Sequence, residues 1–197
     1  MLLALALIIV GYFGPWVAHK DAALILSADD LAEFIKFMPI VRSGQLSIVR
    51  ELFFVPIWLA AIGLNLLGAR SRAVEGRSVL WLLSVILVLT PLPPFTFLIE
   101  AYKSPEFGLT FWTTVAAVLI SAALALFGRR LPDRVAAILW ILFGLAVASI
   151  APLHFIKIQP EIEKLYTFTI GWGFWAVIIG GVMLSAIGLL RLIGHEK

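Results

Sequence analysis

The stretch YTFTIGWGFWAVIIGGVMLSAIGLL, from Tyr166 to Leu190, decides the fold class of this chain. Its 25 residues include no charged side chain, and Arg191 follows at once. A helix rises about 1.5 Å per residue and the hydrocarbon core of a bilayer is about 30 Å thick, so about 20 apolar residues are enough to cross it. The stretch is therefore predicted to form a membrane-spanning helix.

Five further apolar runs of similar length precede this one, separated by segments that hold most of the charges. A soluble domain carries roughly 25% charged residues, whereas this chain has 14%, with 62% hydrophobic residues and a mean hydropathy of +1.06. We therefore predict an all-α integral membrane protein, a polytopic bundle of about six transmembrane helices forming one domain over residues 1–197. The predicted spans are residues 2–18, 48–67, 79–99, 109–127, 135–155 and 166–190.

Arginine is concentrated in two short turns between predicted spans. These turns hold Arg70, Arg72, Arg77, Arg129, Arg130 and Arg134. Because short loops rich in Lys and Arg stay on the cytoplasmic side, we expect both turns and both termini in the cytoplasm, and the protein in the plasma membrane. No Lys or Arg precedes the first run and no Ala-x-Ala-like cleavage site lies near Pro15, so this run is expected to be a retained span and not a signal peptide.

The polar segment between the first two predicted spans contains a short amphipathic helix in the first outer loop, over about residues 27–38. Ser27, followed three residues later by Asp30, matches a capping box at its start. Pro39 is expected to end it, because the residue before a proline avoids helical geometry. The apolar side chains follow i, i+3, i+4, i+7 spacing: Leu31, Phe34, Ile35 and Met38.

The polar face of this helix is acidic, with Asp29, Asp30 and Glu33 against a single Lys36. Helices that adhere to anionic lipid are rich in Lys and Arg on that face, so a different role is expected. The helix is predicted to be a lid on the outer mouth of the bundle or a docking face for a partner. The residues predicted to carry either role are Asp30, Leu31, Phe34, Ile35 and Met38.

Prolines, aromatic residues and charges gather at the outer ends of the predicted spans. The candidates for the outer mouth are Pro91–Phe95, Glu100, Lys103, His154, Lys157 and Trp172. Such a mixture is typical of a pocket for an amphiphile, and equally of an ordinary interfacial belt.

Three of the predicted spans carry stripes of small residues, which let helices approach closely where hydrophobicity gives no drive. The stripes are Ala117, Ser121 and Ala125 on the fourth span, Gly144 and Ala148 on the fifth, and Gly181 and Ser185 on the sixth. They predict either packing within this chain or an interface with a membrane-protein partner or a second copy.

Patterns typical of catalysis, metal binding or ion transport are missing from the sequence. His19, His154 and His195 are not at metal-ligand spacing, no phosphate-binding glycine loop is present, and there is no cysteine. No basic patch with interleaved aromatic residues suggests nucleic acid. The apolar centres of the spans hold no ionisable group, and Asn65 is the most polar side chain among them. We therefore predict no catalytic residue, no metal and no cofactor.

Two functions remain after these exclusions. The first is an accessory or scaffolding subunit of a membrane protein complex, which acts through the outer helix and the small-residue faces. The alternative is a small transporter or binder of a lipid-like or neutral solute, with its site at the outer mouth; a membrane enzyme ranks third.

Overall fold

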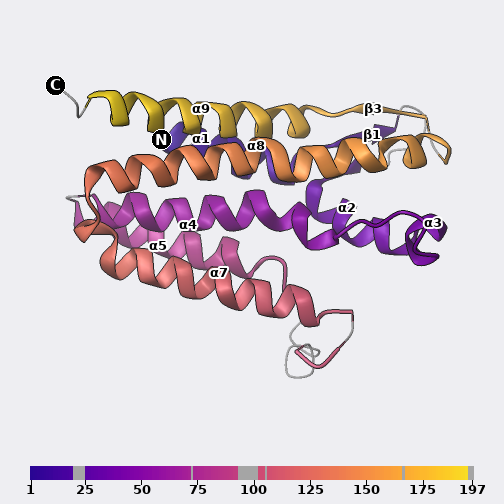
Figure 1. Ribbon diagram of the computed structural model, residues 1–197, viewed down its shortest axis with the longest axis horizontal. Coiled ribbons are helices and arrows are strands. Elements are labelled where there is room, and N and C mark those ends of the chain that lie inside the picture. The colour runs from indigo at the N-terminus through magenta and orange to yellow at the C-terminus, as the bar shows by residue number, and fades with distance from the viewer. Residues whose placement is uncertain (20–24, 72, 93–101, 105, 166, 195–197) are drawn as a thin grey trace.

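The computed structural model describes residues 1–19, 25–71, 73–92, 102–104, 106–165 and 167–194. Within these ranges most of the chain is helical (Figure 1). Four segments are helices long and apolar enough to cross a membrane: Arg50–Ala69, Gly108–Arg130, Asp133–Glu163 and Trp172–Gly194. The predicted helical fold is confirmed, and several apolar helices suggest a membrane-embedded protein.

Six long helices of the described chain run along one axis, each antiparallel to the next (Figure 1). They are α1 Leu2–Phe13, α4 Val55–Ala69, α5 Val74–Leu89, α7 Gly108–Phe127, α8 Asp133–Glu163 and α9 Trp172–Gly194. In Figure 1, α1 begins towards the same end of the bundle at which α9 ends, and the turns between α4 and α5 and between α7 and α8 are also at this end. We call this the terminal end, and the opposite end, which carries α2 and the strands, the cap end.

Helix α4 forms the centre of the bundle. It packs against α1, α5, α7 and α8, while α8 packs against α9 and α9 against α1. Most of α4 is consequently buried, whereas α5, α7, α8 and α9 expose large apolar side chains such as Leu82, Leu126, Leu153 and Leu190. Exposed apolar surface of this extent is unusual on a soluble protein and suits helices that face lipid.

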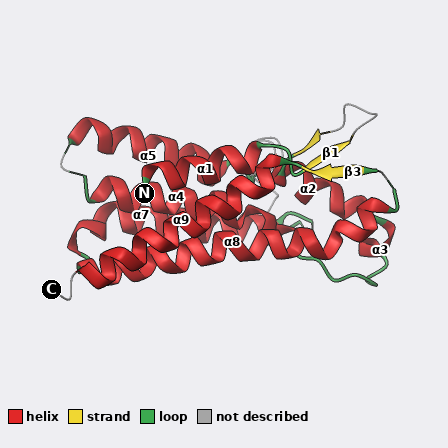
Figure 2. Ribbon diagram, turned by 90° about the horizontal axis from the view of Figure 1, so that it is seen from above, coloured by secondary structure: helices red, strands yellow, loops and turns green. Residues whose placement is uncertain are grey.

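At the cap end, α1 is followed by a strand and α9 is preceded by one, and these strands belong to a small antiparallel sheet (Figure 2). The predicted first and sixth spans are therefore too long at this end. Its strands are β1 Val17–His19, β2 Ile25–Leu26 and β3 Phe168–Ile170, in the order β2-β1-β3. α1 stops at Phe13 because Gly14 precedes a proline and is extended, with φ −75° and ψ 165°. The strand Phe168–Ile170 contains the aromatic and β-branched residues that favour extended backbone.

Other boundaries also differ from the prediction. α5 runs from Val74 to Leu89 instead of over residues 79–99, of which 93–99 lie outside the described residues. α8 continues to Glu163, eight residues beyond the predicted 155, with Pro152 and Pro160 inside it. Prolines are tolerated in helices of membrane proteins, where neighbouring groups satisfy the freed carbonyls. α1 and α5 have 12 and 16 residues, about 18 and 24 Å of rise.

The short helix predicted after the first span is present between α1 and α4. It consists of α2 Ala28–Phe34 and the 3₁₀ turn η1 Ile35–Phe37, followed by α3 Pro39–Arg42. The predicted capping box is confirmed, since Asp30 N donates to Ser27 Oγ at 3.2 Å and Ser27 N donates to Asp30 Oδ2 at 2.9 Å. Met38 is extended, so Pro39 ends the helix as predicted.

Candidate functional site

The apolar face of α2 and η1 is covered by the bundle of the same chain. Leu31, Ile35 and Met38 are buried, and Phe34 is half-buried. α2 packs on the 3₁₀ turn η2, Arg50–Phe54, and on α1. Four of the five residues predicted for a lid or docking role therefore contact their own protein, and Asp30 is engaged in the capping box.

A partly buried hydrogen bond also holds the start of α2 to α1. The Tyr12 hydroxyl donates to Asp29 Oδ1 at 2.9 Å. Partial burial raises the pKa of Asp29 above its usual range, and the negative charges of Asp30 and Glu33 act in the same direction, while the Tyr12 hydrogen bond opposes them. We call α2 and η1 together the cap. Asp29 is thus easier to protonate in the folded protein, where the cap lies against the bundle.

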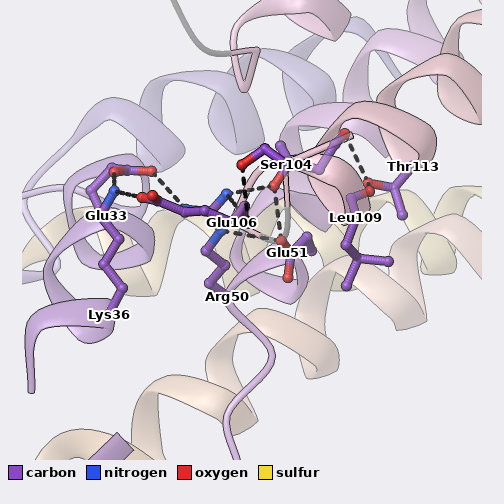
Figure 3. A network of polar contacts seen from close by, with 9 residues as sticks. Glu33, Lys36, Arg50, Glu51, Ser104, Glu106, Leu109 and Thr113 are labelled. Carbon is purple, nitrogen blue, oxygen red and sulfur yellow. Dashed lines mark hydrogen bonds and ion pairs between the residues drawn. The ribbon is translucent and has the colours of Figure 1, made fainter. Parts of the chain in front are cut away.

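A network of charges joins the cap to the beginning of α7 (Figure 3). Its centre is Arg50, whose side chain is 10% exposed beside Glu51 at 8%. Arg50 Nε donates to Glu51 Oε1 at 3.1 Å, and Nη2 donates to Thr110 Oγ1 at 2.9 Å and to the carbonyl oxygen of Glu106 at 2.8 Å. Thr110 in turn donates to Glu51 Oε1 at 2.8 Å. Both buried charges are therefore paired, as burial requires.

The outer part of the network reaches α2 and η1. Lys36 Nζ lies 2.5 Å from Glu33 Oε2 and 2.8 Å from Glu106 Oε1, and Arg50 Nη1 lies 3.4 Å from Glu33 Oε1. The hydrogen bond from Lys36 lowers the pKa of Glu106, with partial burial opposing it and the charge of Arg50 adding to it. A cavity of about 310 Å³ beside the network is lined by Lys36, Arg50, Glu51 and Glu106. Because these four charges pair with one another, the network fastens the cap instead of presenting a free charge.

The predicted outer-mouth residues that are described have separate local partners. Lys103 lies over the Tyr102 ring at 5.2 Å, His154 Nδ1 lies 3.1 Å from the carbonyl oxygen of Ile150, and Lys157 Nζ donates to the carbonyl oxygen of Ser47 at 2.8 Å. Trp172 is about half exposed, and its ring packs against Gly14. Glu100 lies outside the described residues.

These residues do not share one pocket among the cavities of the described chain. Lys103 belongs to the segment before α7, His154 and Lys157 to α8, and Trp172 to α9, and α4 packs between α7 and α8. Of the predicted mouth, Pro91 and Leu92 do line a cavity of about 290 Å³ beside α2, together with Asp29 and Glu33. Residues 93–95 lie outside the described residues.

The small-residue stripes of α8 and α9 face each other. A Cβ atom on Gly181 would lie 2.7 Å from the carbonyl oxygen of Gly144 and 2.8 Å from the amide nitrogen of Ala148. Ser185 Oγ donates to the carbonyl oxygen of Ile141 at 3.1 Å. Packing within the chain, the first of the two predicted roles, therefore accounts for these residues.

The stripe on α7 faces α4 and contributes to a polar cluster inside the bundle. Ala117 and Ser121 are buried, and Ala125 is half-buried. Asn65 Nδ2 donates to Ser121 Oγ at 2.5 Å and to the Ser121 carbonyl oxygen at 3.2 Å. Ser84 Oγ lies 3.1 Å from Ser121 Oγ and donates to the carbonyl oxygen of Ala61 at 2.8 Å. The cluster thus links α4, α5 and α7.

Beside this cluster lies a cavity of about 330 Å³, which we call the α5/α7 groove. It is lined mainly by apolar side chains from α5 and α7, together with Asn65 of α4. The lining residues include Asn65, Trp81, Val85, Leu89, Ser121 and Leu126. Val85, Leu89 and Leu126 are exposed, so the groove lies at the lateral face of the bundle. A second groove of about 330 Å³ lies between α4 and α7, nearer the cap end, and includes Trp58 and Ala116.

Two buried polar atoms of the α5/α7 groove residues, Asn65 Oδ1 and Trp81 Nε1, have no hydrogen-bond partner within the described chain. Trp81 packs against Gly68 of α4, and the Arg77 guanidinium lies 4.4 Å from its ring centroid. Sequence reasoning identified Asn65 as the most polar interior side chain but gave no reason to single out Trp81. In the part of the chain that is described, no group of three or more His, Asp or Glu side chains is arranged to hold a metal ion.

The fold and these sites define a class: a helical protein with several apolar helices of membrane-spanning length and a fastened cap at one end. Comparison with known protein families, with curated proteins and with solved structures found no match to this chain.

Proposed function

We propose that this chain is a non-enzymatic integral membrane protein that spans the bilayer six times and binds one uncharged, lipid-like molecule in the α5/α7 groove. The observation that carries this proposal is the groove itself. It lies at the lateral face of the bundle among exposed apolar side chains, and none of its described lining residues is charged. A molecule dissolved in the bilayer would reach it without passing through water.

The size of the groove suits a small ligand. Small-molecule sites measure about 300–1,000 Å³, and this groove, at about 330 Å³, is at the lower end of that range. A partner helix is about 10–12 Å wide with its side chains and is too large to enter. One hydrocarbon chain is the occupant that the volume supports.

The proposed topology places both termini in the cytoplasm and the cap outside. It is supported by the six long antiparallel helices among the described residues (Figure 1) and by the arginines of the two turns at the terminal end. Arg70 Nη1 donates to the carbonyl oxygen of Leu131 at 3.0 Å, and Arg70 pairs with Asp133, which links the two arginine-rich turns. Basic turns of this kind are typical of the cytoplasmic side.

The scaffolding role predicted first has less support from the geometry. The apolar face of α2 and the stripes of α8 and α9 are engaged within the chain, so they are not free to bind a partner. The role stays a prediction for the remaining lipid-facing surface, and recovery of a stoichiometric membrane-protein partner after mild-detergent purification would support it.

The test is photolabelling in lipid nanodiscs with a hexadecanol that carries a diazirine on its chain. We expect labelled residues to concentrate in α5 and in the half of α7 from Val118 to Leu126, which contribute to the groove. Ala122→Phe, which places a ring in the groove, is expected to reduce this labelling at least fivefold. The matched control is Ala123→Phe, because Ala123 is exposed on the same helix but is not a groove residue.

The proposal fails if labelling is spread evenly over all lipid-facing helices, or if both phenylalanine variants label as the unmodified protein does. It also fails if the groove cross-links to a second copy of the chain, because the occupant would then be protein.

A further inference from the structure

The amide of Asn65 has a fixed orientation inside the bundle. Its nitrogen is 3.2 Å from the backbone carbonyl oxygen of Ser121, which can only accept a hydrogen bond. The nitrogen must therefore face Ser121, and Oδ1 is the atom left over. Asn65 is only 4% exposed, and Oδ1 has no partner within the described chain.

The neighbouring hydroxyl groups do not supply the missing donor. Ser84 Oγ donates its hydrogen to the carbonyl oxygen of Ala61. Ser121 Oγ accepts from Asn65 Nδ2 and lies 3.1 Å from Ser84 Oγ, so its own hydrogen goes to Ser84. With both serine hydrogens used, an acceptor remains unsatisfied at the groove. Leaving a buried polar atom without a partner is unfavourable, so a ligand that satisfies it gains affinity.

We infer that the α5/α7 groove selects a neutral amphiphile whose head group donates a hydrogen bond, a hydroxyl or an amide N–H, to Asn65 Oδ1. This inference rests on the proposed function and specifies its ligand. The hydrocarbon chain lies along α5 from Trp81 towards Leu89, eight residues and about 12 Å further to the cap end. Trp81 lines the groove, and the Arg77 guanidinium lies over its ring.

Charged and donor-free head groups are disfavoured for separate reasons. None of the described groove residues carries a charge that could pair with an ionised head, and an unpaired ion in an apolar site is costly. An ether or ester oxygen offers an acceptor that Trp81 Nε1, the other unpartnered atom among the described groove residues, can bind, but it leaves Asn65 Oδ1 without a donor.

The test compares hexadecanol with its methyl ether as competitors of the diazirine probe in nanodiscs. The two molecules share one chain and differ in the donor. For the unmodified protein we expect the alcohol to compete about threefold to tenfold better than the ether, the range given by one net hydrogen bond. In Asn65→Leu, which lacks the acceptor, the two competitors should be equal.

Ser78→Ala is the matched control. It removes a hydroxyl from α5 outside the groove residues and leaves Asn65 Oδ1 in place, so the preference for the alcohol should persist. Equal competition by alcohol and ether in the unmodified protein overturns the inference and leaves the proposed function standing, since both then occupy the groove. Competition by neither overturns the proposed function as well. The comparison in the unmodified protein needs no variant, so the inference can be tested even if Asn65→Leu folds poorly.

Discussion

Removal of the Arg50 side chain is expected to loosen the cap and destabilise the protein. Arg50→Met keeps most of the length of the side chain but loses four polar contacts, to Glu33, Glu51, Thr110 and the backbone of Glu106. Breaking a buried ion pair by removing one partner costs about 3–5 kcal/mol. Because the side chains of Arg50 and Glu51 keep 10% and 8% exposure, water relieves part of this cost and the lower value, about 3 kcal/mol, applies.

A loss of about 3 kcal/mol corresponds to a fall in Tm of roughly 6–12 °C for a chain of 197 residues. The assay is thermal unfolding of the purified protein in detergent, followed by tryptophan fluorescence. Arg42→Met is the matched control, because Arg42 is exposed on α3, and surface changes usually stay within about 0.5 kcal/mol.

Arg50→Lys separates charge from geometry. Lysine keeps the positive charge but lacks the planar fork that reaches Glu51 and Thr110 together. Its Tm should fall between those of the unmodified protein and Arg50→Met. If Arg50→Met unfolds at the same temperature as Arg42→Met, the network contributes nothing and the reasoning is refuted.

Three further predictions concern stability, measured by the same unfolding assay. Gly181→Val should destabilise by at least about 2 kcal/mol, because its Cβ would lie 2.7 Å from backbone on α8, whereas Gly194→Ala, in open space, should be neutral; equal effects would contradict the packing. Ser27→Ala should cost about 1 kcal/mol through loss of the N-cap hydrogen bond of α2, and Ser27→Gly only a few tenths of a kcal/mol. The pKa of Asp29 is raised in the folded state, so the contribution of Asp29 to the stability of the protein is greatest at low pH and falls as pH rises through that pKa. Asp29→Asn should therefore stabilise the protein at neutral pH. The gain should vanish in acid, where Asp29 is protonated in both states, and a gain independent of pH would refute the assignment.

The parts of the fold that follow local rules could be predicted from the sequence. The capping box at Ser27 and the end of the helix before Pro39 depend on residues a few positions apart. The stripes with Gly144 and Gly181 marked helix faces for close packing, but their pairing with each other is known only from the structure. The ends of the first and last helices could not be placed from hydropathy alone. Val17 and Ala18 continue the apolar run of α1, and Phe168–Ile170 precedes that of α9. Val17–His19 and Phe168–Ile170 become strands by pairing with each other across the whole chain.

The candidate sites depend on long-range contacts that no local pattern reveals. Arg50 and Glu51 fall at the edge of an apolar run, and their partner Thr110 is about 60 residues away. A charged pair at the start of an otherwise apolar span was the available signal. Asn65 is a second example. Its polarity is visible in the sequence, but the unpartnered Oδ1 can be recognised only from the structure, which places Ser84 and Ser121 beside it.

The most direct test of the proposed function is an experimental structure of the protein in lipid nanodiscs that contain hexadecanol. We predict one elongated density in the α5/α7 groove, with its head within hydrogen-bond distance of Asn65 Oδ1 and its chain running towards Leu89. A groove closed by its own side chains, or filled by a helix of another protein or a second copy, would contradict the account.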